Sequence, residues 1–446
     1  MLNVLYLYNS TQTYTNTVFE HIACFGKYSK HRSFYCHQDP TTTFNIDLAL
    51  FDAVAIHFSV RLPYDHLSES TVEALAKFTG LKFLFIQDEY DNTHRAWHWI
   101  RKLGLQLVFT VVPAGGVERV YPAREFPSTH FVSNLTGYVP DELDLDPAVK
   151  FPSQRSLIIG YRGRPLPIRY GRLGMEKIGI GKLVKSYCDT HNIENDIDWT
   201  EASRIYGPRW YEFMVSCRSM LGVESGSNVF DWDGMLDKRI AEYRTLHPYA
   251  KEEEIYKELV ELDEIDGIMN QVSPRVFEAI AAKTVLVLFE GSYSGVVKAD
   301  LHFIAVKKDG SNLAEVMRLL HDGKYVDAIV ERAHQDVIAS GKYSYRTFVK
   351  LVDEQIECHL GALGFSRNIL DPGRLVADVE VAHPVAMTSV PLRAPPPRPS
   401  TDTLSHTVFG AHGVKDLIRR FPIYLWWKLP EAARRLLRPP LKWLLR

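Results

Sequence analysis

The chain has 446 residues, of which 46% are hydrophobic and 24% are charged, and its formal net charge is −2. This length allows two or three domains with cores of their own, and the near-neutral charge excludes a protein whose whole surface binds nucleic acid. No apolar run reaches the roughly 20 residues that a bilayer span needs. The five cysteines include no Cys-x-x-Cys pair, which is typical of reduced thiols in the cytoplasm rather than of disulfides or a zinc site.

Apolar segments alternate with helical patterns over the first 150 residues. The first apolar segment has no basic stretch before it and no small-residue cleavage site, so it predicts a buried strand rather than a secretion signal. Strands that are apolar on both faces and separated by helices predict a parallel sheet covered by helices. The predicted elements are strands at 2–8, 53–58, 82–87 and 107–112, with helices at 17–28, 69–78 and 95–103.

The same alternation begins again after a Pro- and Asp-rich stretch at 139–152. We therefore expect an α/β protein of two Rossmann-like domains, residues 1–150 and 151–362, which face each other across a cleft. In the second half the predicted elements are strands at 156–160, 219–223, 284–289 and 304–306, with helices at 178–190, 251–262, 274–282 and from 313 to about 361.

The composition changes after residue 382. Prolines concentrated in 383–399 predict an extended linker over 383–410. Residues 411–446 carry a net charge of +7, so the 410 residues before them sum to −9. Cations interleaved with aliphatic residues and three tryptophans predict an amphipathic tail at a membrane surface, where each cation contributes about 1 kcal/mol. The alternatives are a helix that packs on the body of the protein, or contact of the tail with nucleic acid.

The most informative local pattern is the stretch 270–284, NQVSPRVFEAIAAKT. Ser273 suits an N-cap, and Pro274 suits the first helical position. The free N–H groups of a helix N-terminus, together with the guanidinium of Arg275, can bind phosphate. Glu278 lies one turn further and can accept both hydroxyls of a ribose, so the set fits a nucleoside diphosphate. The alternative is a surface pair of Arg275 and Glu278, worth about 0.2–0.5 kcal/mol.

With the two-glycine loop Glu290–Gly295 that follows the next strand, this stretch resembles the donor-binding region of GT-B glycosyltransferases. The likeness is to the "glycosyl transferases group 1" and spore-maturation-protein-like branch. It implies that Glu278 binds the nucleotide ribose and that Arg275 lies near the diphosphate. The chain departs from the family pattern at Asn270, where retaining members carry a second glutamate, and at Lys283, where glycine is usual. The first departure leaves the stereochemical outcome open.

Loops at the ends of other strands add candidates for the donor site. Arg162 and Arg164 follow the first strand of the second half, with Lys177 and Lys182 beyond, and fixed cations can stabilise a departing diphosphate. A sharp polar turn at 224–226 follows the next strand and either contacts the donor or satisfies its own backbone. The full set of donor-binding candidates is Arg162, Arg164, Lys182, Glu224, Ser225, Gly226, Ser273, Arg275, Glu278, Tyr293, Ser294 and Gly295.

We expect the first domain to bind the acceptor and to supply the catalytic base. His21, on the first predicted helix, has an ordinary pKa near 6.5 that suits a base. Asp88 and Glu89 follow the third strand, and either could deprotonate a hydroxyl. His57 lies in an apolar strand and is interpreted as a core residue. The sequence Asp231-Trp-Asp233 resembles a metal-binding motif of the other glycosyltransferase fold, but GT-B enzymes generally need no metal, so we predict neither metal nor cofactor.

The sequence therefore predicts a GT-B glycosyltransferase that moves a sugar from a nucleotide-diphosphate sugar to an acceptor hydroxyl. Its expected partners are the donor, a saccharide or lipid-linked acceptor of surface polysaccharide, and the cytoplasmic membrane face through 411–446, without nucleic acid. The alternatives are a sugar-nucleotide epimerase of the same fold and a non-catalytic, membrane-tethered module that binds nucleotide sugars. A dinucleotide oxidoreductase is disfavoured, because no Gly-x-Gly-x-x-Gly turn follows the first strand.

Overall fold

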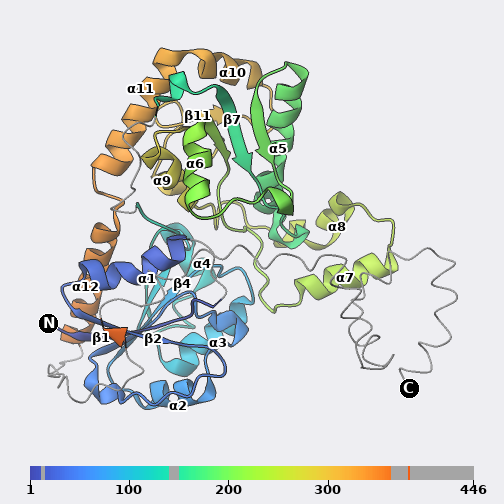
Figure 1. Cartoon of the computed structure of the whole chain (residues 1–446). Helices are drawn as coiled ribbons and strands as arrows, with labels where there is room; N and C mark the ends of the chain where they lie inside the picture. Colours follow the sequence, from blue (N-terminus) through green and yellow to red (C-terminus); the bar gives the residue numbers. More distant parts are fainter. Residues whose placement is uncertain (12–15, 140–149, 363–379, 382–446) are drawn as a thin grey trace, which may run out of the picture. The chain divides into compact units, whose positions relative to one another are not determined.

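The computed structural model describes residues 1–11, 16–139, 150–362 and 380–381 (Figure 1). The expected linker at 383–410 and the expected tail at 411–446 lie outside the described residues. Within the described part, two separate sheets each carry helices on both faces. The predicted fold class, two Rossmann-like domains as in GT-B proteins, is confirmed by this arrangement.

The first sheet has the strand order β12-β2-β1-β3-β4-β5-β6, and all its pairs are parallel except β12 with β2. Its central strands are fully buried because helices cover both faces, which explains their continuous apolar sequences. Along β1, Val4 and Tyr6 face one side and Leu5 and Leu7 the other. The strands are β1 Asn3–Tyr8, β2 Arg32–His37, β3 Ala53–Ile56, β4 Leu81–Ile86, β5 Leu107–Thr110, β6 His130–Ser133 and β12 Glu380–Val381.

The second sheet is parallel throughout and has the order β11-β10-β9-β7-β8. One core lies between this sheet and the helices α5, α10 and α11, and another lies under α6 and α9. Its strands are β7 Leu157–Arg162, β8 Asn195–Asp198, β9 Cys217–Gly222, β10 Val285–Phe289 and β11 Ile304–Val306.

The helices follow the predicted alternation, with additions. The helix α5 begins at its N-terminal glycine, seven residues before the predicted start, and α4, α6 and α7 were not predicted. The helices α6 and α7 each bury an apolar stripe against a neighbouring sheet or helix, and the local sequence does not show that neighbour. The helices are α1 Asn16–Tyr28, α2 Glu69–Lys77, α3 Thr93–Leu103, α4 Val117–Val120, α5 Gly171–Thr190, α6 Pro208–Ser216, α7 Leu236–Leu246, α8 Glu252–Leu259, α9 Pro274–Ala281, α10 Leu313–His321, α11 Gly323–Ala333 and α12 Tyr345–Ala362.

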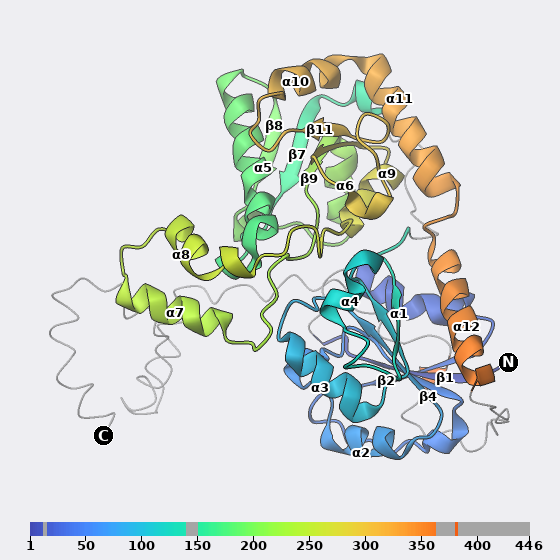
Figure 2. The same cartoon turned by 180° about the vertical axis from the view of Figure 1, so that it is seen from behind.

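The last long helix, α12, returns to the first sheet, although the sequence analysis assigned it to the second domain. Phe348, Val352 and Ile356 are buried in the core that α1 shares with this sheet. Both views show α12 beside α1 (Figures 1 and 2). The chain crosses between the domains a second time here, and the backbone N–H of Val139 donates to the Tyr343 carbonyl at 2.8 Å, so the two crossings lie side by side.

A segment that precedes α7, residues 228–234, joins the second domain to the first; we call it the strap. Phe230 is buried in the first domain's core, next to α3. The backbone N–H of Asp231 donates to the Tyr90 carbonyl at 2.8 Å, and His94 N–H donates to the Trp232 carbonyl at 2.9 Å. The Asp-Trp-Asp motif is thus an interdomain contact. Within the described residues, no group of three or more His, Cys, Asp or Glu side chains is arranged to hold a metal ion.

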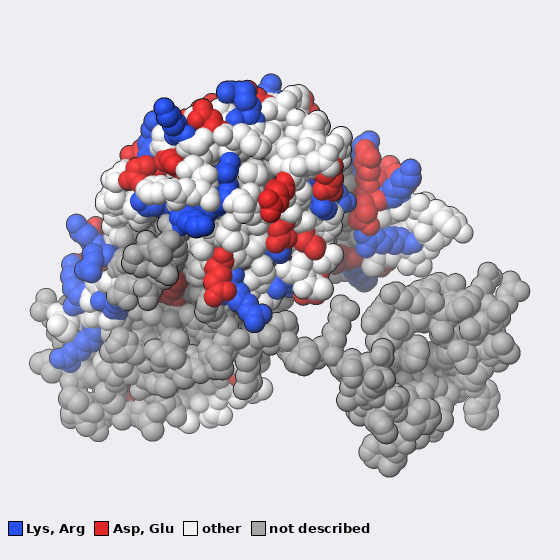
Figure 3. Space-filling view, turned by 45° about the horizontal axis from the view of Figure 1, so that its top comes forward, with Lys and Arg blue, Asp and Glu red and all other residues white. Residues whose placement is uncertain are grey.

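Lys and Arg side chains are interspersed with Asp and Glu side chains on the face shown in Figure 3. Mixed charge of this kind differs from the continuous basic stripe that is typical of nucleic-acid binding surfaces. Among the helices that the structure describes, none combines the length and apolarity that a bilayer crossing requires.

Candidate functional site

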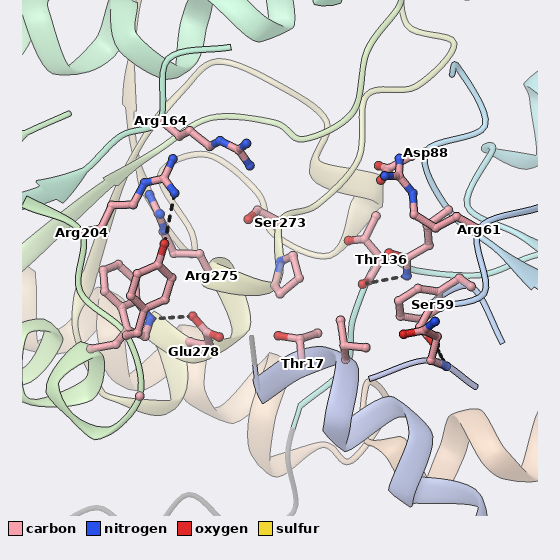
Figure 4. Close-up of a pocket in the computed structure, with 18 of the residues that line it drawn as sticks. Thr17, Ser59, Arg61, Asp88, Thr136, Arg164, Arg204, Ser273, Arg275 and Glu278 are labelled. Atoms are coloured by element: carbon pink, nitrogen blue, oxygen red, sulfur yellow. Dashed lines mark hydrogen bonds between the residues drawn. The ribbon is translucent and has the colours of Figure 1, made fainter. Parts of the chain in front are cut away.

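A pocket of about 1180 Å³ lies where the carboxyl ends of the strands of both sheets meet (Figure 4). Loops after parallel strands converge at one edge of a sheet, so both domains present side chains here. The first domain supplies, among others, Thr17, Ser59 and Asp88, and the second supplies the start of α9 and the loop after β7. Figure 4 shows Arg164, Arg204, Arg275 and Glu278 on one side, with Ser59, Arg61 and Asp88 on the other.

The N-terminus of α9 faces this pocket. Ser273, Pro274, Arg275 and Glu278 all line it. Pro274 occupies the first turn, where its missing N–H removes no hydrogen bond. Ser273 has the extended backbone of an N-cap, with φ −84° and ψ 143°, but its side chain does not cap the helix. Its hydroxyl and the helix N-terminus therefore remain available for an anionic group.

Arg275 and Glu278 do not form an ion pair with each other in the described structure. The Arg275 guanidinium donates to the Arg162 carbonyl at 3.0 Å and lies 5.0 Å from the ring centroid of Trp210. The Glu278 carboxylate accepts a hydrogen bond from the Trp210 indole N–H at 2.9 Å. Burial raises the pKa of Glu278, while the Trp210 hydrogen bond and the charge of Arg275 oppose that shift. The structure therefore does not contain the simple surface pair of Arg275 and Glu278 that was the alternative interpretation.

The cationic side chains of the second domain differ in whether other protein groups already bind them. Arg162 is bound to Asp196 at 2.8 Å and to the Ser203 carbonyl at 3.0 Å, so its guanidinium is engaged by the protein. Among the described residues, the Arg164 side chain lines the pocket without a hydrogen bond or ion pair. Arg164 is therefore the better placed of the two to meet a ligand.

Lys177, rather than Lys182, faces the site. Lys177 lines an adjoining cavity of about 140 Å³, together with Arg164 and Arg275. Burial, and then the charge of Arg275, lower the pKa of Lys177 to about 8. Lys182 lies in a separate surface hollow with Lys185, because five residues along a helix turn a side chain by about 140°. The structure therefore places Lys177, and not the predicted Lys182, beside the candidate donor site.

Glu224 and Gly226 hold loops together rather than facing the pocket. The buried Glu224 carboxylate accepts backbone N–H groups from Ser292 at 3.0 Å and Tyr293 at 2.8 Å, and the Asn270 amide at 2.5 Å. Gly226 has φ +101°, and a Cβ there would lie 2.2 Å from the Met269 carbonyl oxygen, so only glycine fits. The residue between them, Ser225, lines the smaller cavity.

The loop after β10 contacts protein groups. Tyr293 is fully buried, and its hydroxyl donates to the Phe289 carbonyl at 2.7 Å. The Ser294 hydroxyl accepts from the backbone N–H of Val272 at 3.0 Å and donates to Gln271 at 2.9 Å. Neither these two residues nor Gly295 lines the large pocket. The loop fixes the segment that leads into α9.

Of the three base candidates, Asp88 alone lines the pocket. It is exposed and accepts a hydrogen bond from the Tyr90 hydroxyl at 2.6 Å. Glu89 points the opposite way into the core, where it accepts the Thr110 hydroxyl at 2.5 Å and the Val111 N–H at 3.0 Å. Burial raises the pKa of Glu89 to about 7. Both residues lie in the turn that follows β4, where Asp88 has φ +55°, and this turn directs the two neighbouring side chains differently.

His21 is buried among aromatic rings, outside the pocket. Its Nδ1 lies 2.9 Å from His57 Nε2, and His57 Nδ1 lies 2.8 Å from the hydroxyl of Ser59, which does line the pocket. Burial lowers the pKa of His21 to about 3. A base must come within hydrogen-bond reach of the proton it removes. His21 therefore belongs with His57 as a core residue, because the helix face that bears it packs against Phe85 and Phe348.

Sequence reasoning missed the aromatic side of the pocket. Tyr206, Trp210 and Tyr211 line it, and they come from the start of α6 and the loop before it. The one signal in the sequence is the pair Gly207-Pro208, a turn followed by a residue suited to the first helical position. Gly207 has φ +65°, which favours glycine at that turn.

No protein-family model and no curated protein matches the chain. Among solved structures, it is 11% identical to an alpha-glucosyltransferase in complex with UDP and a 13-mer DNA, with a TM-score of 0.45 and coverage of 80% of this chain and 99% of that one. It is 12% identical to HepE from Anabaena in complex with UDP-glucose, with a TM-score of 0.39 and coverage of 81% and 100%.

TarM from S. aureus is also similar, at 10% identity and a TM-score of 0.35. The match covers 68% of this chain and 54% of TarM, so the chain spans about half the length of that protein. The fold is established by the strand order and the helix layers of the chain itself.

Proposed function

We propose that the chain is a glycosyltransferase which binds a nucleoside-diphosphate sugar at the N-terminus of α9. The observation that carries the proposal is the separation of Arg275 from Glu278. Both line one pocket, and neither is neutralised by the other. A carboxylate with free lone pairs can accept ribose hydroxyls, while the guanidinium and the helix N-terminus can hold a diphosphate.

The cations around this helix support binding of the diphosphate. The pocket and its adjoining cavity share Ser273, Arg164 and Arg275, and Lys177 lines the adjoining cavity. The Ser273 hydroxyl does not cap α9. Fixed donors of this kind stabilise charge that develops on a leaving group without reorganising at the moment of reaction. The donor role proposed for Lys182 passes to Lys177, and Arg162 supports Arg275 through its carbonyl oxygen.

In the proposed reaction, the bond between the sugar C1 and the diphosphate oxygen breaks, and a bond forms between C1 and the acceptor oxygen. The electron pair of the broken bond goes to the diphosphate, beside Arg164 and Arg275. The acceptor proton goes to Asp88 on the opposite wall of the pocket. Hydroxyl and amide groups on the same wall, including Ser59, suit a saccharide acceptor.

For the acceptor, we propose a saccharide of surface polysaccharide, lipid-linked at the cytoplasmic membrane face. The support is the sequence of 411–446, with its net charge of +7 and its three tryptophans. Sedimentation of the full chain with vesicles of anionic lipid, but not with vesicles of neutral lipid, is the expected result. A chain lacking 411–446 that still sediments with anionic vesicles would contradict the proposal.

The test of the donor site uses titration of Glu278→Ala with several nucleoside diphosphates, beside Glu258→Ala as a control on an exposed position of α8. The wild-type chain should be stabilised by about 2.7 kcal/mol at one hundred times the dissociation constant. Glu278→Ala should keep the melting temperature of the free protein and lose affinity. Unchanged affinity would refute the assigned role. Release of nucleoside diphosphate that needs no acceptor would favour an epimerase, and binding without turnover would favour a non-catalytic module.

A further inference from the structure

Two buried histidines of the first domain form a chain of hydrogen bonds that ends in the pocket. His57 directly follows β3, His21 lies on α1, and each is only 1% exposed. His21 Nδ1 lies 2.9 Å from His57 Nε2, and His57 Nδ1 lies 2.8 Å from the Ser59 hydroxyl oxygen. At the other end, His21 Nε2 is buried and has no hydrogen-bond partner among the described residues. Ser59 is therefore the member through which the chain reaches the pocket.

The contacts of His57 determine where its proton lies. The backbone N–H of Ser59 donates to His57 Nδ1 at 3.0 Å, so Nδ1 acts as an acceptor and carries no proton. Burial, and then the nearby His21, lower the pKa of His57 well below its ordinary value, so the ring is neutral and its proton is on Nε2. Nε2 then donates to His21 Nδ1. The Ser59 hydroxyl faces the unprotonated Nδ1 at 2.8 Å and must donate to it.

The Ser59 oxygen is left with one way to bind a ligand. A serine hydroxyl has one proton and two lone pairs. The proton is engaged by His57, and one lone pair accepts the backbone N–H of Asn9 at 3.0 Å. Figure 4 shows Ser59 on the side of the pocket that carries Asp88. With its second lone pair, Ser59 can accept a hydrogen bond from a ligand in the pocket, but it cannot donate one.

We infer that Ser59 binds one hydroxyl of the acceptor sugar as a hydrogen-bond acceptor, and that His57 and His21 are the positioning residues that hold it in this state; this inference rests on the proposed function. A serine that can rotate binds a hydroxyl, an ether or a phosphate alike, because it can donate or accept. The fixed Ser59 only accepts, and an ether or phosphate oxygen offers it no hydrogen. The site therefore selects an acceptor sugar that is unsubstituted at the hydroxyl which meets Ser59.

The test measures transfer from a panel of UDP and GDP sugars to octyl glucoside and octyl galactoside and to their monofluoro derivatives. Fluorine replaces a hydroxyl at similar size but cannot donate a hydrogen bond. At one ring position besides the reacting hydroxyl, fluorine should lower the wild-type kcat/KM about 2- to 12-fold, the contribution of one neutral hydrogen bond. In Ser59→Ala this difference should disappear at that position alone. Ser186→Ala, at an exposed position of α5, should keep it.

The role of the two histidines is tested separately. In the full chain labelled with ¹⁵N-histidine, NMR should show His57 Nδ1 as an unprotonated ring nitrogen and Nε2 as a protonated one, and this measurement needs no substrate. The double variant His21→Phe/His57→Phe replaces both hydrogen-bonding partners by apolar rings of similar shape, so the fold should persist. Its Ser59 hydroxyl is free to donate, so the difference in kcat/KM between hydroxyl and fluorine should become smaller.

A proton on His57 Nδ1 would overturn the inference whatever the substrate. So would a wild type that does not distinguish hydroxyl from fluorine at any position, or a Ser59→Ala variant that keeps every such difference, because Ser59 would then only tie its loop to Asn9. Absence of transfer to every glycoside of the series would instead overturn the proposed function.

Discussion

The affinity for a nucleoside diphosphate should fall as the pH rises through about 8, because Lys177 loses its charge there. Burial and the charge of Arg275 lower the pKa of this ammonium group to about 8. About 90% of the free protein then carries the charge at pH 7, and about 10% at pH 9. If the charged form binds, the dissociation constant should rise about tenfold over that interval. The second ionisation of a phosphate, near pH 6, is already about 90% complete at pH 7, so it contributes little to the change between pH 7 and pH 9.

Titration calorimetry with UDP at half-unit steps from pH 6.5 to 9.5 measures this profile. Lys177→Arg should flatten it, since a guanidinium stays charged throughout. Lys177→Met should also flatten it, at the weak affinity that wild type reaches above pH 9. Lys182→Met is the matched control on the same helix and should retain the wild-type profile. A tenfold loss that persists in Lys177→Met would show that another group titrates, and the reasoning would be refuted.

Three further outcomes follow from the geometry. Asp88→Asn should lower kcat roughly 10²–10⁴-fold with unchanged UDP affinity; a wild-type kcat would remove Asp88 as the base. The pKa of Glu89 in the folded protein is about 7, above the ordinary value of 4.5, so the wild type loses stability as the pH rises from about 4.5 through 7. Glu89→Gln should abolish this pH dependence. Urea unfolding of both proteins at pH 5 and 8 tests this, and parallel changes would contradict it. Arg169→Met should cost less than the roughly 3–5 kcal/mol of an unpaired buried charge, because Asp91 loses its partner at 2.6 Å but keeps the Tyr64 hydroxyl at 3.0 Å and Arg61 at 3.6 Å; adding Asp91→Asn should restore part of the loss in urea unfolding.

The sequence predicted the strands that are buried on both faces. In β1, β4 and β10 the apolar run itself encodes burial, because a central parallel strand has no polar side. It did not predict β2, β6 or β8. The last of these has the sequence NDID, and hydrogen bonding to β7, rather than its own pattern, makes it a strand. The edge strands β6 and β8 obtain their conformation from a partner strand that the local sequence does not show.

For the site, local sequence was sufficient where the chemistry depends on one helix end. Ser273, Pro274, Arg275 and Glu278 are close in the chain, so a helix of fixed pitch places them together at the pocket. The remaining groups depend on packing between distant segments. Whether Lys177 or Lys182 faces the ligand depends on how α5 is rotated against its sheet.

Tertiary structure also decided which ionisable side chains are buried. Asp88 and Glu89 are neighbours in the chain, yet one lines the pocket and the other lies in the core. His21 is enclosed by rings from α12, more than three hundred residues away. The sequence by itself determined two parallel sheets and a helix N-terminus suited to a diphosphate, because both depend on local periodicity and capping. Only the folded chain determined the aromatic side of the pocket, the strap and the position of Asp88 opposite α9, because these depend on contacts between residues that are far apart in sequence.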